Sequence, residues 1–309
     1  MNANLKMIAL QEYIPPSLGK IGEFYYDHKN NRIKYFCTQI HHSLDPIEEL
    51  VEEGISRMRT HHATRLNARF FAKKGLFLQD TEAVIPLEDQ YSDLNLLFIG
   101  VNQPSRLDSA YVKEKEDILI SEVFSDRKKH RHNLDGYLID RLNFLNATDQ
   151  DIHDIVRLYH ECFPTYTSVL DEDSVRSMIE HSVVYSARFI KTGKLVSLSV
   201  GEIGRIETSR GEFVICELSE MATKNEHRGR GLVTSITHRL IGEISPSVDL
   251  MYAEARACHK PINQSFFNMG FQYAGRLNKQ CILSGVHEVS EKGPYENLNV
   301  WYLLQPKLT

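Results

Sequence analysis

A short glycine turn between a strand-like and a helix-like segment constrains the fold of this 309-residue chain more than any other feature. Residues 213–223 are rich in β-branched and apolar side chains, which indicates a strand. From Leu232 onward, side chains recur at helical spacing on a mainly apolar face, which indicates a helix. Gly229 and Gly231 lie in the turn between these two segments. The stretch therefore predicts a strand–turn–helix unit.

This turn has the features of a phosphate-binding loop. Glycines let the backbone approach a ligand, and the first N–H groups of a helix have no internal partners and attract anions. Arg228 and Arg230 add positive charge. The P-loop pattern does not fit because no lysine follows Gly231, and the dinucleotide pattern does not fit because Thr234 replaces its third glycine. A strand–helix connection without a ligand is the alternative.

Composition narrows the class of protein. The chain is 42% hydrophobic and 25% charged, which is typical of a soluble globular protein. Its net charge of −5 gives no basic signature for nucleic acid. No apolar run reaches the roughly 18 residues of a membrane span, and we expect no signal peptide because residues 1–10 lack a basic start and a long apolar run. Five scattered cysteines lack metal-ligand spacing. We therefore expect a cytoplasmic protein with reduced thiols and no metal, membrane or nucleic-acid partner.

The length allows two domains, and we predict them at residues 1–135 and 136–309. The boundary follows a basic run at 128–132, which we interpret as a solvated linker rather than a nucleic-acid patch. In the first half we expect a hairpin over 23–40, a helix opened by Asp45 and Pro46, strands at 66–71, 83–86 and 94–101, and partial helix within 106–129. In the second half we expect strands at 136–143, 184–190, 195–203, 213–223, 248–255 and 297–303, and a turn and strand over 270–277. We expect helices capped at Thr148 and starting near 172, 232 and 261.

From about residue 137, this order of elements resembles the GNAT N-acetyltransferases. The GNAT loop that binds the pyrophosphate of acyl-CoA reads Gln/Arg-x-x-Gly-x-Gly/Ala; Arg228 and Gly231 match it, and Val233 departs from it. Two further motifs are similar, an acidic strand at 217–223 and the segment 253–271. The resemblance implies a mixed α/β fold, the GNAT fold, with a central mixed twisted sheet. The N-terminal α/β half is then a degenerate GNAT-like domain, a substrate lid or a dimer platform.

A narrower resemblance is to the β-lysine N6-acetyltransferases. It includes the segments 30–35, 84–86, 96–98, 275–278 and 296–302. It implies transfer of an acetyl group from acetyl-CoA to a primary amine of a small amino acid or amine, β-lysine-like, and a homodimer is compatible with it. Two alternatives stay open. One is acylation of a protein or polyamine; the other is an acyl-CoA-binding sensor without catalysis, suggested by Phe266 and Val233.

The resemblance also implies site residues. Acetyl-CoA would contact Met221, Ala222, Thr223, Arg228, Gly229, Arg230, Gly231, Leu232, Val233, Thr234, Asn263 and Phe266. The acceptor amine must lose a proton, so a carboxylate is needed as base. Glu217 is our first candidate and Glu220 our second, and a structural salt bridge is the alternative for each. They face opposite sides of an ideal strand, but a bulge, which GNAT enzymes have there, would change that.

The remaining candidates are aromatic. GNAT enzymes commonly protonate the departing thiolate with a tyrosine, and Phe266 stands at that position here. Tyr252 or Tyr273 is the expected substitute, and we name Tyr252 as catalytic. Asn263 would hold the pantetheine arm. Tyr166 and Trp301 are candidate substrate-pocket residues, with core packing as the alternative.

Overall fold

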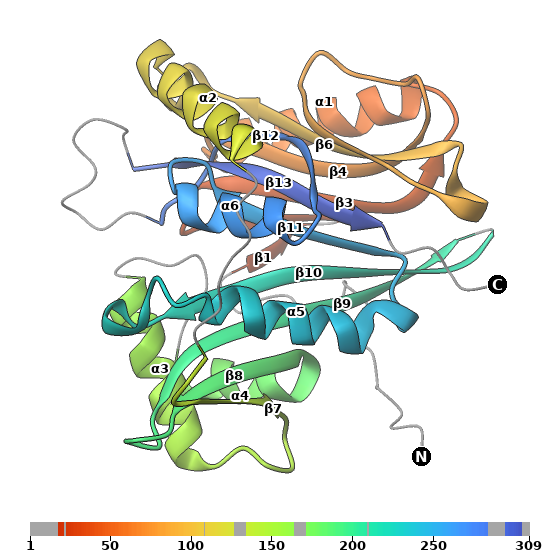
Figure 1. Cartoon of the computed structure of the whole chain (residues 1–309). Helices are drawn as coiled ribbons and strands as arrows, with labels where there is room; N and C mark the ends of the chain where they lie inside the picture. Colours follow the sequence, from red (N-terminus) through yellow and green to blue (C-terminus); the bar gives the residue numbers. More distant parts are fainter. Residues whose placement is uncertain are drawn as a thin grey trace.

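Thirteen strands form one mixed sheet in the computed structural model, in the order β1-β2-β3-β4-β6-β5-β12-β13-β11-β10-β9-β8-β7 (Figure 1). The structure describes residues 18–21, 23–107, 109–126, 134–163, 171–208, 210–283 and 294–304. The first half of the chain contributes β1 (Leu18–Ile21), β2 (Phe24–Asp27), β3 (Arg32–His41), β4 (Arg65–Lys73), β5 (Thr81–Pro86) and β6 (Leu94–Asn102). Its helices are α1 (Asp45–Thr60) and α2 (Ala110–Ser125), with 3-10 turns at Asp89–Tyr91 and Pro104–Arg106.

The second half contains the other seven strands. They are β7 (Tyr137–Leu142), β8 (Val183–Phe189), β9 (Leu195–Thr208), β10 (Gly211–Thr223), β11 (Leu250–Arg256), β12 (Gln272–Cys281) and β13 (Glu296–Leu304). The helices are α3 (Asp149–Cys162), α4 (Glu172–His181), α5 (Leu232–Ile244) and α6 (Lys260–Asn268), with 3-10 turns at Asn225–His227 and Ser245–Ser247. Thr148 caps α3 in a capping box with Asp151, as the sequence predicts. The predicted strands and helices are confirmed in type and order.

The strand arrangement of the second half is repeated in the first. In the second half, β9 and β10 are antiparallel, α5 leads to the parallel strand β11, and β13 and then β12 add antiparallel. In the first half, β2 and β3 are antiparallel, α1 leads to the parallel strand β4, and β6 and then β5 add antiparallel. The expectation of a GNAT-like N-terminal half agrees with this order.

The helices divide the faces of the sheet. Alternate residues of a strand point to opposite faces, so Ile215 and Tyr252 lie in one apolar cluster while Cys216 and Met251 lie in another. The cluster around Cys216 also contains residues of α5, α6 and α2. The cluster around Tyr252 contains residues of β4, β5 and β6, such as Phe98. The two halves therefore share one core, and α2 of the first half packs on α6 of the second.

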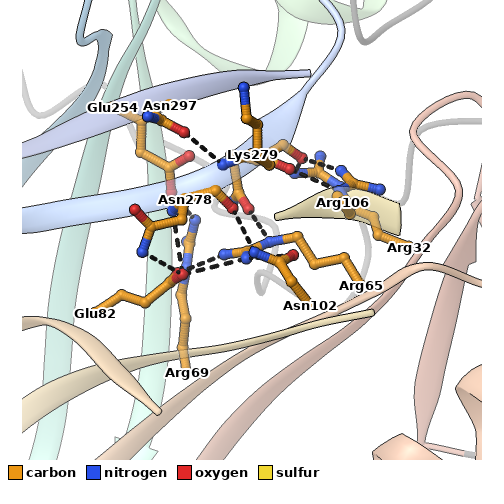
Figure 2. A network of polar contacts seen from close by, with 11 residues as sticks. Arg32, Arg65, Arg69, Glu82, Asn102, Arg106, Glu254, Asn278, Lys279 and Asn297 are labelled. Carbon is orange, nitrogen blue, oxygen red and sulfur yellow. Dashed lines mark hydrogen bonds and ion pairs between the residues drawn. The ribbon is translucent and has the colours of Figure 1, made fainter. Parts of the chain in front are cut away.

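The halves join where β5 pairs with β12, in the register Gly275 opposite Ala83. Gly275 has φ +147°, and a Cβ there would lie 2.3 Å from the carbonyl oxygen of Glu82. The carboxylate of Glu82 accepts hydrogen bonds from Arg65 at 3.2 Å and from the side chain of Asn278 at 3.0 Å (Figure 2). The motif at 275–278 that supports the family resemblance thus forms this joint.

A buried arginine reinforces the joint. Arg106 is 2% exposed and donates to the backbone carbonyls of Lys279 at 2.7 Å, Gln280 at 3.0 Å and Asn30 at 2.6 Å. Its guanidinium also lies over the ring of Tyr295. Burial lowers the pKa of Arg106 to about 9.

The predicted domain boundary at 135/136 adjoins residues 127–133, which lie outside the described ranges, and it stays a prediction. In the described part of the chain, no helix combines the length and the apolar character needed to cross a bilayer. All five cysteines are free thiols.

Candidate active site

The glycine turn has the geometry of an anion-binding helix start. Gly231 is the N-cap of α5, with φ +76° in the left-handed region, and it supplies no side-chain cap. The first N–H groups of α5, at Leu232, Val233 and Thr234, have no i−4 partners within the helix. Arg230 is exposed beside them. These N–H donors, the positive end of the helix dipole and the charge of Arg230 together favour the binding of a phosphate.

The turn before Gly231 is anchored on both sides. The side chain of Arg228 donates to the carbonyl of Thr223 at 2.9 Å, which ties the turn to the end of β10. The hydroxyl of Tyr137 on β7 shares a hydrogen bond with His227 at 2.8 Å. Gly229 also has positive φ, +75°, and is exposed. A loop fixed in this way presents its backbone donors without reorganisation.

Strands β10 and β11 stop pairing well before β10 ends. Their parallel register covers only Ile215 to Glu217, with Glu217 opposite Tyr252, although β10 continues to Thr223. The register of β10 with β9 shifts between Ser219 and Ala222, which is a β-bulge. Backbone groups of 218–223 that would otherwise face β11 are thus outside that ladder. The predicted bulge in the acidic strand is present.

Glu217 is the last residue of β10 that pairs with β11, and its carboxylate interacts with residues of both halves. Tyr252 donates its hydroxyl hydrogen to the Glu217 carboxylate. Arg69 of β4 donates to the Tyr252 hydroxyl at 2.6 Å, pairs with Glu254, and lies 3.8 Å from the Glu217 carboxylate. Figure 2 shows the Arg69 and Glu254 side chains together. Burial raises the pKa of Tyr252 well above its ordinary value, so this phenol keeps its proton at neutral pH.

A second carboxylate stands directly beside Glu217 across the β9–β10 ladder. The register pairs Glu202 with Glu217, and the hydroxyl of Ser219 donates to Glu202. Burial, followed by the charge of Glu217, raises the pKa of Glu202 to about 7. Like charges directly opposite each other on a sheet are destabilising, so this pair points to a functional site. Sequence reasoning missed Glu202; only the hairpin register between 202 and 217 could have indicated it.

Glu220 occupies the bulge itself. It is half-buried and has φ +52°, a left-handed conformation that is uncommon for a residue other than glycine. The hydroxyl of Tyr159 on α3 donates to the Glu220 backbone carbonyl at 3.4 Å. Backbone strain of this kind tends to occur at functional sites. The role of Glu220 as a second base stays a prediction.

The other residues predicted on β10 line the same segment. Met221 is half-buried against the α5 cluster, and Ala222 is buried against α3 and α4. The hydroxyl of Thr223 is hydrogen-bonded to Ser197 at 2.7 Å. These residues form the end of β10, just before the turn that leads to α5, and their role in binding acetyl-CoA stays a prediction.

Asn263, Phe266 and Trp301 lie apart from Glu217. Trp301 is fully buried on the α5 and α6 side of the sheet, opposite the side that carries Tyr252 and Glu217. Its indole donates to Asn263 at 2.8 Å, and the Asn263 amide also donates to the carbonyls of Arg256 and His259. Phe266 packs in the same cluster.

These contacts favour core packing, the alternative interpretation for Trp301, and the assigned roles of Asn263 and Phe266 stay predictions. Tyr166 lies outside the described residues. Tyr273 packs against Trp301 rather than against Tyr252. Among the described residues, no group of three or more His, Cys, Asp and Glu side chains could hold a metal ion.

Known proteins resemble parts of this chain. No family model matches the sequence. The N-acetyltransferase YodP of Bacillus subtilis is 24% identical over 203 residues, which cover 65% of this chain and 66% of that protein. The β-lysine N(6)-acetyltransferase of Methanosarcina mazei is 26% identical over 156 residues, which cover 50% of this chain and 52% of that protein. The chain thus aligns with just under two thirds and about half of the length of these relatives.

A solved structure adds a comparison. The Arabidopsis thaliana NAA60 complex with acetyl-CoA aligns with 54% of this chain and 98% of its own, at 14% identity and a TM-score of 0.44. The strand order β12-β13-β11-β10-β9-β8-β7, the bulge in β10 and the glycine turn agree with what the sequence motifs imply. The chain is thus similar to two N-acetyltransferases, and its sheet and glycine turn agree with the GNAT resemblance.

Proposed function

We propose that this protein is an acetyl-CoA-dependent N-acetyltransferase that acts on a primary amine of a small amino acid or amine, with a β-lysine-like acceptor as the first candidate. One observation carries the proposal. Glu217 stands where β10 and β11 stop pairing, and Glu202, whose pKa is about 7, stands opposite it. The relative from Methanosarcina mazei suggests the acceptor.

The residues present suit the binding of acetyl-CoA. The pyrophosphate would accept hydrogen bonds from the uncapped N-terminus of α5, next to Arg228 and Arg230. The pantetheine arm would lie along residues 221–223, where β10 has left its ladder with β11. When bound, acetyl-CoA supplies the acetyl group as a thioester.

The chain's own residues would manage the protons and the charge. An acceptor amine arrives as an ammonium, and the carboxylate pair of Glu217 and Glu202 can bind it and accept one proton. A base with a pKa near 7 suits this transfer at neutral pH. Backbone N–H groups beyond the bulge can stabilise negative charge on the acetyl oxygen. The new N–C bond then forms as the C–S bond breaks.

Tyr252 fits two roles in this scheme. Tyr252 donates a hydrogen bond to Glu217 and accepts one from Arg69, which supports a role for Tyr252 in positioning the carboxylate of the base. Its raised pKa makes the phenol a reluctant donor of its proton to a thiolate, whose own pKa is about 8.5. Donation by Tyr252 to the thiolate therefore stays the weaker part of the proposal.

The test is acetyl-CoA turnover. Purified protein, acetyl-CoA and a panel of amines (β-lysine, lysine, a diamine, a polyamine and a peptide with an N-terminal amine) would be assayed for CoA release. We expect release with a small amine. Thermal stabilisation by acetyl-CoA without release from any amine would favour the sensor instead. No stabilisation in excess acetyl-CoA would overturn the acyl-CoA site itself.

A further inference from the structure

A lysine from the first half of the chain faces this candidate site. Lys34 is the third residue of β3, and β3 contacts β9. Its neighbours Ile33 and Tyr35 point into the cluster under α1. Because side chains alternate along a strand, Lys34 points the other way, toward the strands of the second half. In Figure 1, β3 and β4 lie above β9 and β10.

Lys34 has no counter-ion within the part of the chain that the structure describes. No carboxylate oxygen among the described residues lies within 4 Å of its ammonium, whereas Arg32 pairs with Asp27 at 2.8 Å and Arg65 pairs with Glu82 at 2.5 Å. Burial and the charges of Arg32 and Arg69 lower the pKa of Lys34, and Asp27 and Glu217 oppose this. A half-buried cation without a paired anion is costly, which indicates a place for an anionic ligand group.

The residue beside Lys34 is also unsatisfied. Asn67 of β4 pairs in register with Lys34 and is 3% exposed. Its side-chain carbonyl oxygen has no hydrogen-bond partner among the described residues. A buried polar atom without a partner costs free energy unless a ligand satisfies it. An ammonium next to a free amide oxygen favours a group that carries both an anion and an N–H donor, as the head of an amino acid does.

We propose that β3 and β4 supply the acceptor's carboxylate subsite, with Lys34 as its cation and Asn67 as its neighbouring hydrogen-bond acceptor. This inference rests on the proposed function and deepens it. The charges of Lys34 and of the Glu217–Glu202 pair act on each other, yet the Lys34 ammonium lies more than 4 Å from both carboxylates, so a ligand would have to span the space between them. The acceptor would therefore be an amino acid whose reacting amine is several bonds from its carboxylate. In this scheme Lys34 determines specificity and takes no part in the proton transfer.

The experiment compares two acceptors that differ only in the carboxylate. Lysine and cadaverine share a terminal primary amine, and cadaverine lacks the carboxylate. We expect Lys34→Gln to raise the KM for lysine by about 10-fold or more, the loss typical of a charged hydrogen bond, with kcat within about 3-fold. The kcat/KM for cadaverine should change by less than about 3-fold, because that acceptor leaves the subsite empty.

Two further variants separate specificity from folding. Lys34→Arg keeps the charge and should retain most of the preference for lysine over cadaverine. Lys73→Gln removes an exposed charge from the far end of β4 and should change neither acceptor. Equal losses for both acceptors in Lys34→Gln, or none for either, would overturn the subsite and leave the proposed function intact. Failure of every amine to release CoA from the unmodified protein would overturn both.

Discussion

The Glu217 carboxylate offers the most direct test of the site. Glu217→Gln keeps the shape of the side chain but cannot accept a proton, so we expect kcat to fall by about 10²–10³-fold. Steady-state kinetics would measure the fall, and calorimetric titration should give an unchanged Kd for acetyl-CoA. The control is Glu212→Gln on the same strand, whose carboxylate pairs with Arg205. Full turnover by the Glu217→Gln variant would contradict the assignment of Glu217 as the base.

The pH dependence should report Glu202. Its folded pKa is raised from the ordinary value of a carboxyl to about 7, so below that pH the group is protonated and cannot accept the amine's proton. We therefore expect kcat/KM to decline as pH falls through 7. Glu202→Gln should remove this decline at low pH and lower the kcat/KM reached above pH 7. If the variant has the same pH profile, the decline near pH 7 belongs to another group. If the unmodified protein shows no decline near pH 7, the raised pKa of Glu202 is contradicted.

At this scale the sequence predicted one carboxylate of the pair and missed the other. Glu217 stands in a recognisable acidic strand, and its motif could be matched. Glu202 lies 15 positions earlier in a plain hairpin strand, and only the register brings it opposite Glu217. Arg69 and Lys34 come from the other half of the chain, so no local pattern could place them here. Such residues are set by tertiary pairing, which local patterns do not encode.

At the scale of elements, a substitution that adds one methyl group can test whether the start of α5 binds phosphate. Gly231→Ala puts a Cβ on a left-handed residue, at a cost of about 1–2 kcal/mol, and tilts the N–H groups that would bind phosphate. We expect the affinity for acetyl-CoA to fall by about 10-fold in calorimetric titration, a change equal to roughly 1.4 kcal/mol. Gly242→Ala in the same helix is the control, because its added Cβ meets nothing within 4 Å.

Gly242→Ala should leave the affinity unchanged and raise the unfolding free energy by about 0.5–1 kcal/mol, since alanine is the better helix former. Unchanged acetyl-CoA affinity in Gly231→Ala would argue against the phosphate cradle. The order of elements could be predicted here because each of them has its own periodicity. The place where β10 and β11 stop pairing could not, because it depends on two strands separated by the whole of α5.

At the scale of the whole molecule, two similar strand arrangements share one sheet but differ in their helix starts. Helix α5 begins at a bare glycine, whereas α1 begins with Asp45 and Pro46 and carries Glu48 in its first turn. Acidic side chains at a helix start occupy the positive end of the dipole and repel phosphate. We therefore expect the first half, although it repeats the strand order of the second, to bind no phosphate at the start of α1. Its strands β3 and β4 instead contribute Lys34 and Arg69 to the candidate site.

This union of two halves could be only partly predicted. The sequence indicated two halves of similar plan, but it could not show that β5 and β12 would pair or that one core would contain residues from both. The joint depends on Gly275, which the sequence places in a predicted strand without indicating what it contacts. A glycine is required at this position because the backbone of Glu82, almost two hundred positions away in the chain, leaves no room for a Cβ.

Gly275→Ala should therefore destabilise the whole protein. The new Cβ would lie 2.3 Å from a backbone oxygen and 2.7 Å from the Cα of Ala83, so the two strands must move apart. We expect a loss of about 2–6 kcal/mol in unfolding free energy, because about 1–3 kcal/mol of overpacking adds to about 1–3 kcal/mol of backbone strain, seen as a lower midpoint in urea. The control is Gly75→Ala, where φ is +91° but the added Cβ meets nothing within 4 Å. That variant carries the backbone strain alone and should cost about 1–2 kcal/mol.

The comparison of these two variants isolates the steric contact from the conformational strain. If the loss in Gly275→Ala comes from separating the halves, Arg69 will also move away from Tyr252, and kcat should fall under conditions where the protein is still folded. A Gly275→Ala protein as stable and as active as Gly75→Ala would show that the β5–β12 pairing is dispensable. The two halves would then act as independent units, and the carboxylate subsite on β3 and β4 would lose its structural support.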